Sequence, residues 1–155
     1  MSTIIHSLLD RLIDTAPEET IEPIEDDEAA LARYKISLRR DLEMLLNAKR
    51  PDLTGLDRHP DLETTVAGFG LRDISTEDFS ATGARDRVRR MVAQAIRQHE
   101  TRLTRIEVEI DDRLTANGVR LRVSAQLTLS RARDDVVYEA MVRPGDRTIS
   151  VQIGD

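Results

Sequence analysis

Apolar residues recur at helical spacing through the first two-thirds of the chain. Residues three or four apart predict a long helix over 28–50, ended by Pro51; its apolar stripe is Leu31, Tyr34, Leu38, Leu42, Leu45 and Leu46. A second helix is predicted after Ser80 or Thr82, either of which can cap it. Leu103 continues its apolar face, which begins with Val88, Met91, Val92, Ala95, Ile96 and His99. Between them, prolines and glycines predict a half-ordered connection with a helical turn or two near 61–67.

In the last third the period changes from 3.6 to 2, which is typical of half-buried strands. One strand alternates Ile106, Val108 and Ile110 with Arg105, Glu107 and Glu109. After an Asn117-Gly118 turn, a longer one alternates Val119, Leu121, Val123, Ala125, Leu127 and Leu129 with polar residues. Two shorter strands are predicted near 136–143 and 148–153, joined by a turn at 144–147. The predicted class is α+β: an antiparallel four-stranded meander in the C-terminal half, packed against helices from the N-terminal half.

The front of the chain has a different character. Ile4, Ile5, Leu8, Leu9 and Leu12 predict a short amphipathic helix over 3–14. The segment PEETIEPIEDDE at 17–28 then carries seven acids and no base, which favours an extended tether. We therefore divide the chain into residues 1–27, helix and tether, and residues 28–155, the folded domain. The first helix either docks, on a partner or on the body's own flank, or remains loosely attached.

Composition narrows the possible functions. Of the net charge of -6, residues 1–32 hold nine acids and one base, so the other 20 acids and 22 bases leave the body near neutral. Cysteine is absent, and neither a signal peptide nor a long apolar run is present, so we expect a soluble, cytoplasmic protein. Arg85, Arg87, Arg89, Arg90 and Arg97 cluster on one helix, but a charged outer face explains them better than nucleic acid does, because aromatic residues make up only 3%.

Candidate chemistry is sparse. His6, His59 and His99 lie on separate elements without the converging ligands that a metal site needs, and His99, on an apolar stripe, is expected to be a hydrogen-bonded core or rim residue. No nucleophile elbow or phosphate-binding loop is present, and we expect no cofactor. The unusual feature is Glu100-Thr101-Arg102, where two opposite charges stand at a helix-to-strand junction too short for a flexible loop.

Three stretches, in order, resemble the phage-tail baseplate wedge family, called lysozyme-like, in its bacterial type VI secretion (TssE) branch. They are SLRRDLEMLLNAKRP at 37–51, HPDLETTVAGFGLRDIS at 59–75 and HETRLTRIEVEI at 99–110. The resemblance covers residues 6–153. Glu100 and Arg102 match the charged ends of the family's Glu-Pro-Arg motif, whereas Thr101 replaces its proline. A proline there would fix φ, so we expect Thr101 to let the helix end fray more.

The resemblance implies a non-enzymatic structural subunit with a fold similar to the sheath protein's interlocking domain. Its implied partners are other wedge subunits, contractile sheath subunits and the spike or hub, at a baseplate on the cytoplasmic face of the inner membrane, without membrane insertion or nucleic acid. Glu100, Thr101 and Arg102 are the candidate partner-binding residues; the alternative is that the charge pair only caps the helix and braces the strand.

Two other functions remain open. A peptidoglycan-cleaving enzyme would need two carboxylates about 5–9.5 Å apart in a sugar-sized cleft, yet Trp is absent and only two Tyr and two Phe could line one. A small adaptor outside any secretion machine would follow if the resemblance were accidental, and neighbouring genes for sheath, tube and spike would exclude it.

Overall fold

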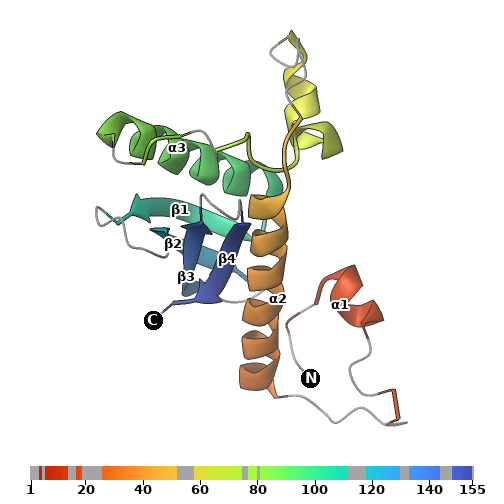
Figure 1. Cartoon of the computed structure of the whole chain (residues 1–155). Coiled ribbons are helices and arrows are strands. Elements are labelled where there is room, and N and C mark those ends of the chain that lie inside the picture. Colours follow the sequence, from red (N-terminus) through yellow and green to blue (C-terminus); the bar gives the residue numbers. More distant parts are fainter. Residues whose placement is uncertain are drawn as a thin grey trace.

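Helices and a four-stranded sheet make up the molecule (Figure 1). This computed structural model describes residues 4, 6–13, 17–18, 26–51, 58–74, 77–79, 81–111, 118–129, 133–143 and 148–154. In chain order the elements are α1 Leu8–Leu12, α2 Asp27–Asn47, the 3-10 turns η2 Pro60–Thr64 and η3 Val66–Gly68, α3 Thr82–His99, and strands β1 Leu103–Ile110, β2 Val119–Thr128, β3 Arg133–Arg143 and β4 Thr148–Ile153. The predicted α+β class is confirmed.

The sheet is the predicted meander. Its strand order is β1-β2-β3-β4, and each neighbouring pair is antiparallel. Along β2 every second residue is buried, from Val119 to Leu127, while those between them face away from the core. Because side chains alternate across a strand, this pattern fixes which face of the sheet meets the helices.

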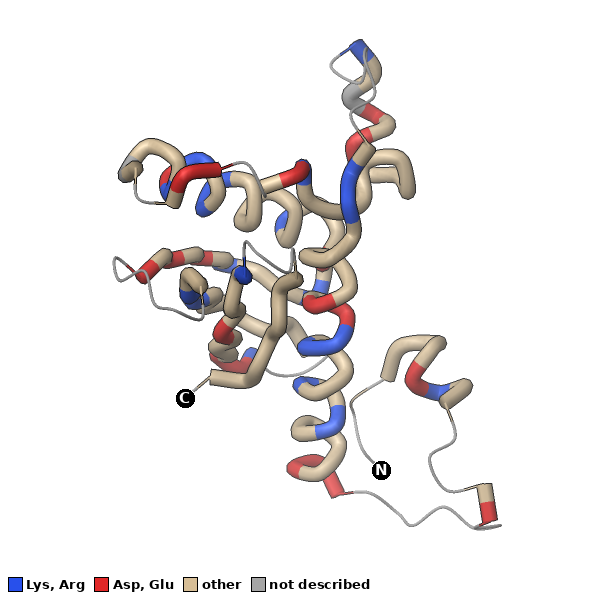
Figure 2. Tube along the Cα trace, in the orientation of Figure 1, with Lys and Arg blue, Asp and Glu red and all other residues tan. Residues whose placement is uncertain are grey.

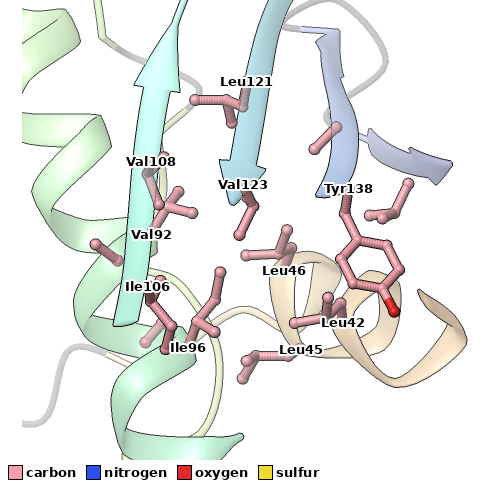
Figure 3. Packing of buried hydrophobic residues seen from close by; sticks show 14 of the residues in the cluster. Leu42, Leu45, Leu46, Val92, Ile96, Ile106, Val108, Leu121, Val123 and Tyr138 are labelled. Atoms are coloured by element: carbon pink, nitrogen blue, oxygen red, sulfur yellow. The ribbon is translucent and has the colours of Figure 1, made fainter. Parts of the chain in front are cut away.

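Helices α2 and α3 cover that face. Helix α3 packs along β1 and α2 packs along β4 (Figure 1). Figure 3 shows side chains from both helices and three strands pointing into one core: Leu42, Leu45, Leu46, Val92, Ile96, Ile106, Val108, Leu121, Val123 and Tyr138. Each fully buried leucine or isoleucine stabilises the fold by roughly 1.5–3 kcal/mol. This packing holds both helices, and therefore the junction after α3, in fixed positions on the sheet.

Helix α2 begins earlier and ends earlier than the sequence predicts. The Asp26 side chain caps it by accepting a hydrogen bond from the Ala29 N–H at 2.7 Å, and two acids follow in its first turn, where the helix dipole favours them. The last three acids of the segment assigned to the tether therefore start a helix. At the other end, Ala48 is extended and Lys49 pairs with Leu71 in a parallel bridge. This pairing ends the helix before Pro51 can.

The start of α3 differs from the prediction. Its N-cap is Ala81, without a side-chain hydrogen bond, and Thr82 is already helical, so the predicted Thr82 cap is wrong. The alternative cap, Ser80, lies outside the described residues. Apolar packing therefore places the beginning of this helix, since Ala84 and Val88 in its first turns are both buried.

Leu103 was predicted to continue the apolar face of α3, but it is the first residue of β1. Leu103 and Ile106 are both buried although three residues apart, which a regular strand does not allow. A bulge provides the extra residue: Thr104 pairs with Gln126 and Glu107 with Ser124, and Arg105 between them has φ 51°. The first strand therefore begins two residues before its alternating pattern, at Leu103 rather than at Arg105.

The connection before α3 forms the turns predicted near 61–67, as η2 and η3. It is attached to α3 through His99, whose Nε2 lies 3.1 Å from the Gly68 carbonyl oxygen and whose ring meets Phe69 edge-on at 5.3 Å. The prediction that His99 is a hydrogen-bonded core or rim residue is confirmed, and its partial exposure places it at the rim.

Candidate functional site

The junction between α3 and β1 is a tight, ordered corner. The Glu100 N–H caps α3 by donating to the Ile96 carbonyl at 2.8 Å, and the Leu103 N–H donates back to the Glu100 carbonyl at 3.3 Å. Only Thr101 and Arg102 lie between the helix cap and the first residue of β1, and the Thr101 side chain is exposed. The predicted rigid helix-to-strand corner is therefore present.

Glu100 and Arg102 bind each other. Arg102 Nε donates to Glu100 Oε1 at 2.7 Å, Nη2 donates to Oε2, and the Arg102 backbone N–H donates to Oε1 at 3.1 Å. Glu100 is 7% exposed. A forked guanidinium–carboxylate pair of this kind is strong and directional. The pair therefore braces the corner through contacts within the chain, as the bracing interpretation of the sequence expects.

The pair belongs to a longer row of alternating charges that crosses α2. Arg102 Nη2 also donates to Asp41 Oδ2 at 2.8 Å, and Arg40 Nη2 donates to Asp41 Oδ1 at 3.0 Å and to Asp10 Oδ1 at 2.8 Å. Charges of both signs accordingly follow one another along the middle of α2 (Figure 2). This row of ion pairs joins the N-terminal segment, α2 and the start of the sheet. We name it the charge row of the corner; its members are Glu100, Arg102, Asp41, Arg40 and Asp10.

Sequence reasoning missed Asp41 and Asp10. A signal for Asp41 was present, because it follows Leu38 by three residues and precedes Leu45 by four, so it lies beside the apolar stripe, where an unpaired charge is costly. Asp10 gives no comparable signal, since its partners Ser37 and Arg40 are 27 and 30 residues away.

Arg102 stays charged in the charge row. Hydrogen bonding to Glu100, together with a second hydrogen bond to Asp41, raises the pKa of Arg102 above its ordinary value despite partial burial. The Arg102 guanidinium also lies 5.7 Å from the centre of the Tyr34 ring, within range of a cation–π contact. Burial raises the pKa of Tyr34, so this ring stays neutral beside the cation. The corner therefore presents a permanently charged guanidinium that lies over the neutral Tyr34 ring.

Helix α1 docks on the body's own flank, with a polarity opposite to the expected one. It covers only Leu8–Leu12 of the predicted 3–14, and its buried residue is Asp10, which accepts hydrogen bonds from the hydroxyls of Ser7 and Ser37. The flanking leucines are exposed. Burial alone would raise the pKa of Asp10, but the hydrogen bonds from Ser37, Ser7 and Arg40 hold it at about 2.

The attachment of α1 is expected to depend on pH. Because the pKa of Asp10 falls from 3.8 to about 2 on folding, its contribution is fully present above pH 4 and is lost as the pH falls toward 2. Asp10→Asn is therefore expected to be less stable than the wild type at pH 6, with the difference shrinking toward zero near pH 2. Urea unfolding of both proteins at several pH values measures it; a difference independent of pH would contradict the assignment.

The two edges of the sheet differ. The edge of β4 is closed by α2: Asn47 Nδ2 donates to the Ile149 carbonyl at 2.7 Å, its Oδ1 accepts from the Ile149 N–H at 2.8 Å, and Arg39 donates to the Val151 carbonyl at 3.0 Å. The amide of Asn47 thus replaces a neighbouring strand. Side chains that cover an edge in this way prevent strand addition.

The edge of β1 borders a groove of about 740 Å³ beneath α3. Residues 106–109 of β1 line one side, and since four consecutive residues face it, the groove follows the backbone edge. The Asp111 N–H bonds the Arg120 carbonyl in β2, so by alternation the backbone groups of Val108 and Ile110 point away from β2. On the α3 side stand Arg89, Arg90 and Arg97, the last donating to the Ile106 carbonyl at 2.8 Å.

The residues that the structure describes contain no group of three or more His, Cys, Asp or Glu arranged to hold a metal ion. None of the helices among them has the length and apolarity to cross a bilayer.

Comparison with known families decides the class of protein. The family model described as baseplate wedge protein gp25 matches residues 32–132. The chain belongs to this family. Baseplate wedge proteins are structural components of phage-type tails, and membership implies contacts with other baseplate components. No curated protein and no solved structure matches the chain.

The matched region contains most of the candidate site. It includes most of α2, with Asp41 and Asn47, all of α3, the Glu100–Arg102 corner and the groove edge of β1. In this baseplate wedge protein, the three segments that carry the family resemblance therefore meet. The motif over 37–51 supplies Asp41 to the corner and Asn47 to β4, and the motif over 99–110 supplies the corner and the β1 edge. The motif over 59–75 joins both, through the bridge of Leu71 to Lys49 and the contact of Gly68 with His99.

Proposed function

We propose that this baseplate wedge protein works in a type VI secretion baseplate, where it contacts the other wedge subunits and docks the first ring of the contractile sheath. It acts by binding rather than catalysis, in the cytoplasm at the inner face of the inner membrane. In support, each carboxylate of the charge row is bound to a guanidinium. The pKa of Asp10 is lowered, which is the reverse of what a general acid requires.

The observation that carries the proposal is the asymmetry of the sheet edges. An extended segment of a sheath subunit can add to β1 through its outward backbone groups and lie beneath α3 in the groove. Addition to β4 would first have to displace the amide of Asn47 from Ile149. Strand addition is therefore assigned to the β1 edge.

Two matched substitutions test this assignment. Gln94 lines the groove on α3 and Gln152 lies on β4, and both side chains are exposed, so a tryptophan at either position is tolerated by the fold. We expect Gln94→Trp to reduce sheath assembly at least tenfold, because the indole occupies the groove, while Gln152→Trp stays near wild type. The readout is the number of fluorescent sheaths per cell, with soluble protein levels as a control. Loss with Gln152→Trp alone would place docking at β4.

The corner is proposed to contact neighbouring wedge subunits. Arg102 keeps 21% of its side chain exposed although it is bound to Glu100 and Asp41, and Thr101 beside it is exposed. A partner would therefore meet Thr101 and the rim of Arg102, while Glu100 holds the guanidinium from behind.

A further inference from the structure

The N-terminal segment and α2 expose apolar side chains around one polar contact. Leu8 and Leu12 are 71% and 72% exposed, and Leu9 and Ile13 are also exposed. On α2, Ile36 and Met44 are 54% and 55% exposed. These two residues lie one turn before and one turn after Arg40, the residue that binds Asp10 of α1. We call these six residues the N-terminal apolar surface.

This clustering is unusual for a protein surface. Among the described residues nine large apolar side chains are exposed, and the N-terminal apolar surface accounts for six of them. Single exposed apolar residues need no explanation, but a group of them around one contact marks an interaction site. Helix α1 lies on the side of α2 that faces away from the sheet (Figure 1), so its exposed leucines are separate from the β1 edge.

The structure holds these side chains outward. A five-residue helix is not stable by itself, and α1 is attached to α2 by the Asp10 carboxylate, which bonds Ser37 and Arg40. Just before the helix, Ile4 packs against the core, whereas the leucines of α1 itself remain exposed. The polar attachment leaves them available and fixes their orientation, which lowers the entropy cost of binding.

Charge indicates which partner fits. Residues 1–32 hold nine acids and one base, and the first turn of α2 is acidic (Figure 2). The bases of α2 near the surface are already paired within the chain: Lys35 with Asp134, Arg39 with Glu43, and Arg40 with Asp10 and Asp41. A second copy of this chain would bring two acidic segments together, and an anionic membrane would repel them.

We propose that the N-terminal apolar surface binds an amphipathic helix of another protein, whose apolar stripe is flanked by Lys and Arg. The stripe covers Leu8, Leu12, Ile36 and Met44, and the flanking bases meet Asp27 and Glu28 in the first turn of α2. This interface is independent of strand addition at β1.

Two synthetic helical peptides with the same leucine stripe, one with lysine and one with glutamate at all other positions, are the probes. Binding to the full chain is measured by fluorescence anisotropy at low and moderate salt. We expect the lysine peptide to bind at least tenfold more tightly than the glutamate peptide, and Leu8→Ser/Leu12→Ser to lose that affinity at least tenfold. The matched control is Leu62→Ser/Val66→Ser, which removes two exposed apolar side chains elsewhere and is expected to bind normally.

Several outcomes would overturn the proposal. Equal binding of the two peptides, or equal loss in both double variants, would show that the surface does not recognise a basic helix. Concentration-dependent dimerisation in sedimentation, abolished by Leu8→Ser/Leu12→Ser, would assign the surface to a second copy. Binding to phosphatidylglycerol vesicles but to neither peptide would assign it to a membrane.

Discussion

Glu100→Ala is expected to lower the free energy of unfolding by roughly 2–3 kcal/mol, or the melting temperature by roughly 5–10 °C. Removing the buried carboxylate leaves Arg102, whose side chain is only 21% exposed, without three of its hydrogen bonds. The effect is placed below the usual cost of breaking a buried pair because Asp41 still faces the guanidinium at 2.8 Å. Urea unfolding of wild type and variant measures it.

Thr101 provides the matched control at the same corner. Its side chain is exposed, so Thr101→Ala is expected to change stability by less than about 0.5 kcal/mol. Thr101→Arg adds bulk at the exposed position without replacing a member of the charge row, so it tests binding. Recovery of wedge subunits in a pull-down with this variant should fall severalfold. If recovery is unchanged while Glu100→Ala merely unfolds, the corner is an internal brace and its proposed contact with wedge subunits is excluded. A stability change below about 0.5 kcal/mol in Glu100→Ala would contradict the brace instead.

Periodicity predicted the elements of the fold because burial sets it. The stripe through Leu38, Leu42 and Leu45 and the alternation along β2 each follow from having one buried face, and both are confirmed. Leu103 was misassigned for the same reason: it follows His99 by four residues and so continues the helical stripe, and only the bulge at Arg105 lets it be buried together with Ile106 in a strand. A bulge depends on pairing with residues about twenty positions away, which local spacing does not report.

The candidate site was predicted only in part. The corner residues could be found because opposite charges stood on a junction, but their partner Asp41 comes from another helix, and the docking of Asp10 reverses the polarity that its own helix implies. The difference between the two sheet edges could not be inferred either. Asn47 closes β4 from 102 residues away, a contact that depends on how α2 crosses the finished sheet.

Gly70→Ala is expected to destabilise the protein by about 3 kcal/mol or more, because the backbone at this position admits no side chain. Gly70 has φ 105°, beyond the left-handed region that other residues reach, and a Cβ would lie 2.2 Å from the Ala48 carbonyl oxygen. That oxygen accepts from the Leu71 N–H at 2.8 Å, and the Arg50 N–H donates to the Leu71 carbonyl at 2.8 Å. The substitution therefore disrupts the bridge that ends α2 and displaces the buried Leu71.

Gly83→Ala is the matched control, with an effect of opposite sign. Gly83 lies in the first turn of α3, where a Cβ would meet nothing closer than Arg87 at 3.7 Å, so alanine is expected to stabilise the protein by about 0.4–1 kcal/mol. Urea unfolding compares the two variants.

Because the bridge beside Gly70 fixes α2 against the segment leading to α3, Gly70→Ala should also weaken the contact of Asp41 with Arg102. In a double-mutant cycle, the destabilisation by Asp41→Asn should therefore be smaller in the Gly70→Ala background. Equal effects of Asp41→Asn in both backgrounds would show that the corner is positioned independently of this bridge.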